Sequence, residues 1–167
     1  MVGKNTMGIA DQIRVTLRAG IDESRLSTIV VGDWRSFKSL SSLLPAVFIK
    51  VISQSWRIAS TSHFDVDQKI EIIYITDSRE GWEQHDQKET TNYYLLRDVV
   101  GEMSTTEQLR KDTILFNLMQ DVTINGQCLT LGDIDVVFQE AVNIGEEIFM
   151  NMAIITIKPK TTVQTEF

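Results

Sequence analysis

The segment 66–76 alternates in polarity, and it constrains the fold of this chain more than any other segment. In an extended conformation, Ile70, Ile72 and Tyr74 lie on one side, whereas the other side mixes charged and apolar residues. A strand with one wholly apolar face and one mixed face is typical of an antiparallel sheet that is covered on one side. The segment therefore predicts both neighbouring strands and a covering layer.

The rest of the chain supplies candidates for those elements. The sequence predicts helices over 7–19, 93–100 and 105–118, and strands over 27–31, 46–52, 134–138 and 148–157. Asn125-Gly126 predicts a two-residue hairpin turn, 33–43 a loop or short helix, and 53–65 a long loop. We expect an α+β fold: a single domain, with an antiparallel β-sheet and helices packed on one face. The domain is predicted over residues 1–158, followed by a flexible C-terminal tail over 159–167.

Length and composition exclude several classes of protein. The chain has 167 residues, of which 43% are hydrophobic and 23% charged, as in a globular domain rather than a disordered chain. No apolar run approaches the ~20 residues of a membrane span, and the first residues contain no apolar signal core, so we expect neither a span nor a secretion signal. The single cysteine, Cys128, excludes an intrachain disulfide framework, and we expect it to be a buried small hydrophobe.

The net charge of −7 is concentrated in one segment. No Lys or Arg lies between Lys111 and Lys158, whereas seven acidic residues do: Asp112, Asp121, Asp133, Asp135, Glu140, Glu146 and Glu147. A chain with this charge is a poor candidate for gripping phosphate backbones, which requires clustered Lys and Arg. A solvated acidic face is the simplest interpretation.

Motifs for catalysis are scarce. The sequence contains no Gly-x-Ser-x-Gly elbow, no phosphate-binding Gly-x-x-x-x-Gly-Lys loop and no Gly-x-Gly-x-x-Gly turn. The nearest constellation places His63, Asp65 and Asp67 on one side of an extended segment, where they could share a metal ion, with His85 as the only further histidine. Polar residues at the solvent edge of a strand explain this pattern equally well. We expect no enzyme and no cofactor, and keep a small metal-dependent enzyme as the alternative.

All three tryptophans fall in predicted loops or at their edges. Loop aromatics either fold back over the core or anchor a protein–protein interface, where Trp and Arg are enriched. Trp56-Arg57 is the sharpest such pair. The candidate interface residues are Trp56, Arg57, Phe64 and Trp82.

The order of these elements resembles a known family. After the first predicted helix, the run 43–49 (Leu-Leu-Pro-Ala-Val-Phe-Ile) resembles the first strand of the tail-terminator proteins of long-tailed bacteriophages. In that family a long insert follows, and then a second strand, a helix and two closing strands, matched here by 70–76, 92–101, 134–138 and 149–157. The resemblance covers residues 7–158 and rests on this order and on the Leu-Leu-Pro-Ala entry.

The resemblance implies a structural virion protein rather than an enzyme. Such proteins form a homo-oligomeric ring, a hexamer, on the last ring of the tail tube, where they end tube growth and provide the docking surface for the head connector. The implied partners are further copies of the chain, the tail tube protein, the head–tail connector or stopper and, in contractile tails, the sheath. The implied location is the neck of the virion, assembled in the host cytoplasm. Another neck or baseplate ring component is the alternative within this class.

DNA must pass through the channel of such a ring without binding. Carboxylates repel phosphates over about a Debye length, ~8 Å at physiological salt. The candidate channel-facing acids are Asp121, Asp133, Asp135, Glu140, Glu146 and Glu147.

Overall fold

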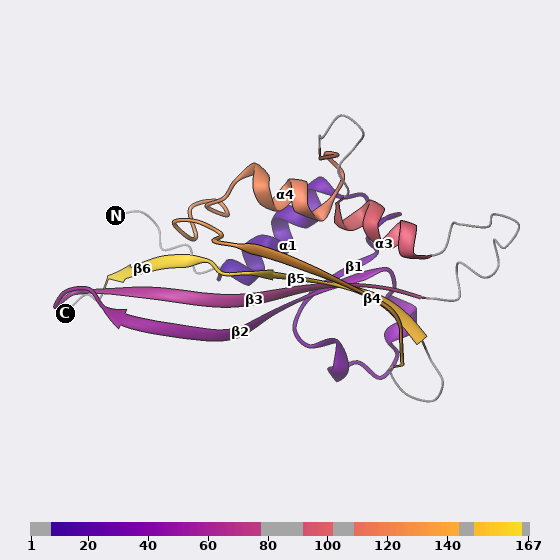
Figure 1. Ribbon diagram of the computed structural model, residues 1–167, viewed down its shortest axis with the longest axis horizontal. Helices are drawn as coiled ribbons and strands as arrows, with labels where there is room; N and C mark the ends of the chain where they lie inside the picture. Colours follow the sequence, from indigo (N-terminus) through magenta and orange to yellow (C-terminus); the bar gives the residue numbers. More distant parts are fainter. Residues whose placement is uncertain (1–7, 78–91, 102–108, 144–148, 165–167) are drawn as a thin grey trace, which may run out of the picture.

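The computed structural model describes residues 8–77, 92–101, 109–143 and 149–164, which form one sheet with helices (Figure 1). The helices are α1 (Ile9–Gly20), α3 (Asn92–Val100) and α4 (Ile114–Gln120), and the strands are β1 (Thr28–Val31), β2 (Ala46–Ile58), β3 (His63–Asp77), β4 (Ile134–Asn143), β5 (Phe149–Ile157) and β6 (Lys160–Gln164). The strand order is β1-β2-β3-β5-β4, and β6 also pairs with β3. Only β1 and β2 pair in parallel. The predicted α+β class is confirmed.

The three helices lie on one face of the sheet, here called the helical face (Figure 1). The alternation in β3 places Ile70, Ile72 and Tyr74 on this face, and all three are fully buried. α1 contributes Ile13 and Leu17 to the same core, one helical turn apart, as the sequence predicts. The main hydrophobic core therefore lies between the helices and β3 with its two neighbours.

The opposite face, here called the open face, is covered at one end by described residues. Phe48 and Ile75 are buried there beneath the segment 33–44, which forms the short 3-10 helices η1 (Trp34–Ser36) and η2 (Leu40–Leu43). Leu40 is buried in this smaller cluster, and Trp34 packs against it. Of the two alternatives for a loop aromatic, Trp34 therefore follows the first and folds back over the core.

The long loop predicted over 53–65 is wrong. β2 continues to Ile58, β3 begins at His63, and a tight turn over 59–62 joins them through the Ala59 N–H bond to the His63 carbonyl at 3.0 Å. Residues 53–55 (Ser-Gln-Ser) carry no apolar alternation, so their strand conformation arises from pairing with β3 rather than from local preference. The insert expected from the resemblance is therefore an extension of both strands.

The flexible tail predicted over 159–167 is wrong for residues 160–164, since Lys160–Gln164 form β6 and pair antiparallel with residues 63–67 of β3. Pro159 separates β5 from β6. Pairing with β3 does not end there, because the Pro159 carbonyl accepts a hydrogen bond from the Gln68 N–H and the residues after it pair with the outer part of β3.

The hairpin predicted at Asn125-Gly126 is also wrong. Ile124, Asn125 and Gly126 have φ angles of 48°, 53° and 76°, as a tight turn requires, but no strand flanks them. Asp121 holds this turn instead. The helix predicted over 105–118 begins only at Ile114, capped by Thr113, while residues 102–108 lie outside the described part of the chain.

Candidate interaction surface

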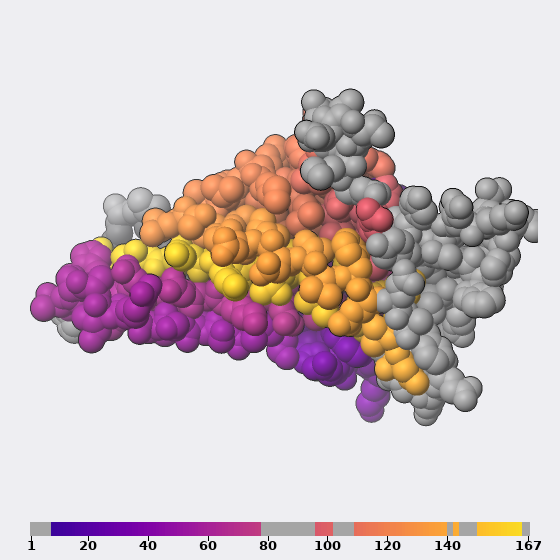
Figure 2. Space-filling model, viewed as in Figure 1, coloured from indigo at the N-terminus to yellow at the C-terminus, as the bar shows by residue number. Residues whose placement is uncertain are grey.

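The outer parts of β2 and β3 form a projecting arm with β6 alongside. We define the arm as residues 50–69 together with β6. Its register pairs Trp56 with Val66, Ile58 with Phe64, and Phe64 with Val163. Figures 1 and 2 show the arm tapering away from the helices at one end of the molecule.

One side of the arm is apolar, and two of its side chains are exposed at the tip. Because directly paired residues share a face, Trp56, Ile58, Phe64 and Val163 lie on the continuation of the helical face. Trp56 is 53% exposed and Ile58 is 78% exposed. The Trp56 ring meets the Phe64 ring edge-on, with centroids 6.2 Å apart. These four residues are here called the arm patch: Trp56 and Ile58 are exposed, and Phe64 and Val163 are half-buried. Exposed hydrophobic surface of this kind marks a binding site.

The other side of the arm is polar and internally paired. Arg57 forms an ion pair with Asp67 at 3.0 Å, and Asp65 accepts a hydrogen bond from the Thr162 hydroxyl at 3.3 Å. The His63 Nδ1 lies 3.1 Å from the Ser60 hydroxyl. These contacts join residues of the arm and its turn to one another, and they therefore stabilise the arm.

This geometry separates the three proposed metal ligands. His63, Asp65 and Asp67 share the polar side of β3, as predicted, but each has its own partner. Alternate residues of a strand are ~7 Å apart, so His63 and Asp67 are ~13 Å apart along the chain. Within the described ranges, no three His, Cys, Asp or Glu side chains gather as metal ligands do. His85 lies outside those ranges.

The predicted interface residues are thus only partly brought together. Trp56 and Phe64 meet on the arm patch, Arg57 lies on the opposite side, and Trp82 lies outside the described residues. Ile58 and Val163 were not predicted as part of this surface, because they fall in the predicted loop over 53–65 and the predicted flexible tail over 159–167. The period-two spacing of Trp56 and Ile58 was the available signal.

Four strands have an outer edge without a neighbouring strand among the described residues: β1, β2 over 50–58, β4, and β6 beyond Lys160. β1 pairs only with residues 46–49 of β2, which leaves the outer edge of β2 open over 50–58. β4 is the last strand on the opposite side. Exposed edges present unpaired backbone N–H and C=O groups and are sites of pairing with another chain.

The acidic segment divides between a turn and the β4 edge. Asp121 accepts hydrogen bonds from the Thr123 hydroxyl (2.6 Å) and from the backbone N–H groups of Asn125 (2.9 Å) and Thr123 (3.0 Å). These bonds, led by the Thr123 hydroxyl, hold the pKa of Asp121 below its usual value. Asp121 therefore stabilises its own turn.

The other described acids lie at β4. Asp133 precedes the strand and is exposed, and Asp135 lies on the open face, 4.0 Å from the Lys158 ammonium. The open face also carries a Glu71–Lys50 cross-strand pair, so its charge is mixed. Glu140 belongs to β4, but its side chain is outside the described part, as are Glu146 and Glu147.

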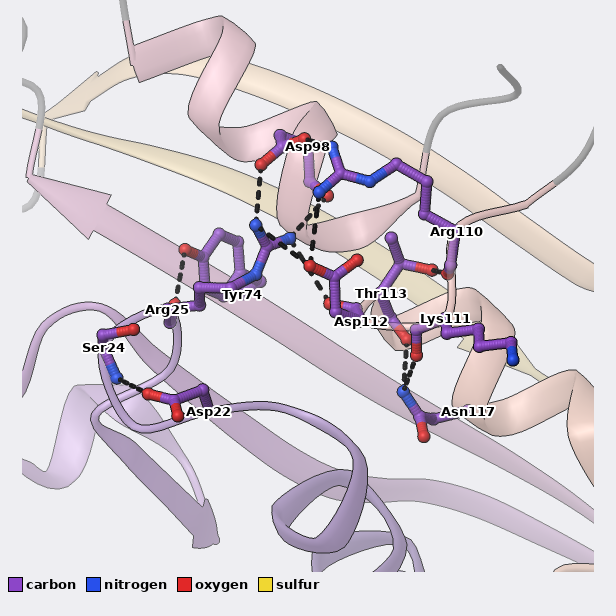
Figure 3. Close-up of polar contacts among 10 residues, drawn as sticks. All are labelled: Asp22, Ser24, Arg25, Tyr74, Asp98, Arg110, Lys111, Asp112, Thr113 and Asn117. Atoms are coloured by element: carbon purple, nitrogen blue, oxygen red, sulfur yellow. Dashed lines mark hydrogen bonds and ion pairs between the residues drawn. The ribbon is translucent and has the colours of Figure 1, made fainter.

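A second polar cluster holds the covering layer together (Figure 3). Arg25 binds the Asp98 carboxylate at 2.9 Å and lies 3.5 Å from the Asp112 carboxylate. Arg110 pairs with both carboxylates as well. Two guanidinium groups thus meet two carboxylates, which balances their charge. The cluster joins the segment before β1, α3 and the segment before α4, and its members bind one another, as expected of a structural cluster.

No protein-family model matches this chain, and no curated protein matches its sequence. None of the helices in the described ranges is both long and apolar enough to cross a membrane.

Proposed function

We propose that this chain is the tail terminator of a long-tailed bacteriophage, a structural subunit that forms a hexameric ring at the head-proximal end of the tail tube. The ring ends tube growth and provides the docking surface for the head connector. Its partners are other copies of the chain, the tube protein, the connector or stopper, and the sheath where one exists. Its place is the virion neck.

The arm patch is the observation that carries the proposal. A subunit that works alone gains nothing from four apolar side chains at the tip of a projecting hairpin, whereas an oligomer buries them. The open edges of β2 and β4 add two places for pairing between subunits. The elements α1, β2, β3, α3, β4 and β5 follow one another in the order expected from the resemblance, with β1, α4 and β6 in addition and without the expected insert between β2 and β3.

The channel wall follows from the two faces of the sheet. The helical face is covered, so we assign the open face to the lumen, where Asp135 and Glu71 lie. Asp121 belongs to a turn beside α4, on the other side of the sheet, and is not assigned to the lumen. The open face also carries basic side chains, of which Lys50 is paired with Asp33 and Arg57 with Asp67. DNA passes without specific binding because these charges are paired and the carboxylates nearest the β4 edge oppose its phosphates.

Deletion of the gene from the phage that encodes it tests this function. A terminator ends tube growth, so its loss yields tubes of uncontrolled length that carry no heads, and the wild-type gene supplied in trans restores normal virions. Tails of normal length joined to heads would contradict the proposal. Loss of tubes altogether would instead indicate a component that acts before tube growth, as a baseplate ring does.

A further inference from the structure

We infer that successive copies join head to tail, the open edge of β2 in the arm of one copy pairing with the β4 edge of the next. This inference rests on the proposed function and deepens it, because it names the two surfaces that build the ring. The partner is a second copy of this chain.

The positions of the two edges determine the type of assembly. The β2 edge and the β4 edge lie toward opposite ends of the strand order. When two different surfaces pair, a dimer still has one free β2 edge and one free β4 edge. Further copies can therefore add head to tail, and the ring closes when the rotation between successive copies brings the last copy to the first. Pairing of β2 with β2 would instead stop at a two-fold dimer.

The charges of the two edges are complementary. The arm carries four basic residues against two acidic ones: Lys50, Arg57, Lys69 and Lys160 against Asp65 and Asp67. Lys50 is paired with Asp33 and Arg57 with Asp67, so the excess positive charge of the arm comes from Lys69 and Lys160. The segment 133–143 carries Asp133, Asp135 and Glu140 and no basic residue. A basic arm is therefore attracted to an acidic edge, and two arms or two β4 edges repel each other.

The same arrangement covers the arm patch. When the sheet continues from β2 into the β4 strand of the next copy, the helical faces of both copies lie on the same side. The patch lies on the helical face but beyond the helices of its own copy (Figure 1). The covering layer of the neighbour then lies beside Trp56 and Ile58 and removes them from water, which is the main gain on association.

Cysteine cross-linking of the full-length chain tests the pairing. Ser55 in the arm and Val137 in β4 are both exposed, and both lie on the open face. We would introduce S55C and V137C separately and together, and treat the proteins with a short bis-maleimide. Cys128 remains in place, because burial raises the pKa of its thiol to about 11 and leaves little reactive thiolate. S41C, which changes an exposed residue of η2, is the matched control.

The expected products are specific to a head-to-tail contact. Neither single variant cross-links with itself, an equal mixture of S55C and V137C gives dimers, and the double variant gives a ladder that ends at the ring. S41C mixed with either partner gives no product. Self-linking of S55C would show pairing between arms and overturn the inference.

The failure of this inference is distinguishable from failure of the proposed function. Rings seen by negative-stain electron microscopy without a cross-link between S55C and V137C would overturn the inference and leave the function standing. Normal tail length after gene deletion would remove the function. A cross-linked ladder that persists in that case would support the contact alone.

A second variant separates the arm patch from folding. W56S combined with I58S replaces two exposed side chains and leaves the core intact, so the circular dichroism spectrum stays unchanged while cross-linking falls at least tenfold. V15S changes a side chain of α1 that is 43% exposed, and it serves as the control that keeps cross-linking. Unchanged cross-linking in the double serine variant would overturn the role of the patch.

Discussion

Trp56 packs edge-on against Phe64 across the two strands of the arm, and Trp56 is still 53% exposed. A pair of aromatic rings in this geometry contributes about 0.5–1.5 kcal/mol beyond its buried area. The pair therefore fixes the shape of a surface that remains largely open to water. The arm is preorganised for a partner, which lowers the entropic cost of binding.

Replacement of Trp56 by serine is expected to affect association far more than stability. A central tryptophan of an interface contributes about 2 kcal/mol or more, which corresponds to about a 30-fold weaker association. Analytical ultracentrifugation gives the association constant, and thermal unfolding of the dilute protein gives the stability. V15S serves as the control, and equal association of W56S and wild type would contradict the expectation.

A side chain at Gly20 is expected to lower the free energy of unfolding. A Cβ at this position would lie 1.7 Å from the Oδ1 of Asn117, and Asn117 is held by a 2.7 Å bond from its side-chain amide to the Thr113 carbonyl. Overpacking of this kind costs about 1–3 kcal/mol, so G20A should lower the free energy of unfolding in urea by that amount. G8A, where the nearest atom is 3.8 Å away, is the matched control and should change it little.

The Arg25–Asp98 pair is expected to stabilise the covering layer. R25M leaves the Asp98 carboxylate with Arg110 alone and removes two bonds to backbone carbonyls, those of Asp98 and Asp112. Bonds to charged groups contribute about 1.5–3 kcal/mol, so the free energy of unfolding should fall within that range. A double-mutant cycle with D98N measures the coupling, and additive effects of R25M and D98N would contradict the assignment.

The Asp121 turn predicts a dependence of stability on pH. Hydrogen bonds lower the pKa of Asp121 in the folded chain, so its contribution is present above the unfolded pKa, about 3.9, and is lost as pH falls through the folded value. D121N should thus be less stable than wild type near pH 7, and the difference should shrink below about pH 4. T123V removes the strongest of these bonds and should act in the same direction. A difference that is constant with pH would contradict this explanation.

The Cys128 thiol is expected to react slowly. Its pKa of about 11, raised mainly by burial, leaves almost no thiolate at pH 7.4. The thiol should therefore label with a maleimide many times more slowly in the native chain than in urea. Equal rates would show that the turn beside it opens freely.

The sequence predicted the covered part of the fold and missed the exposed part. Ile70, Ile72 and Tyr74 alternate because one face of β3 must be buried, and α1 shows its helical period for the same reason. The arm has no buried residue at 53–58, and its alternation there is limited to Trp56 and Ile58, which is too short to predict a strand. β6 forms because the outer part of β3 offers unpaired backbone groups, a tertiary cause that local sequence does not contain.

The candidate surface could be predicted only in part for the same reason. Trp56 and Phe64 were recognisable as aromatics without a core position, but their contact depends on the register of β2 and β3. Arg57 follows Trp56 in sequence and lies on the opposite side of the strand because side chains alternate.

Native mass spectrometry of the purified full-length chain measures the size of the assembly and any bound metal. We predict a closed ring of six 19.0 kDa subunits without bound metal, a particle of about 114 kDa. A monomer or dimer that carries a stoichiometric metal ion would contradict it.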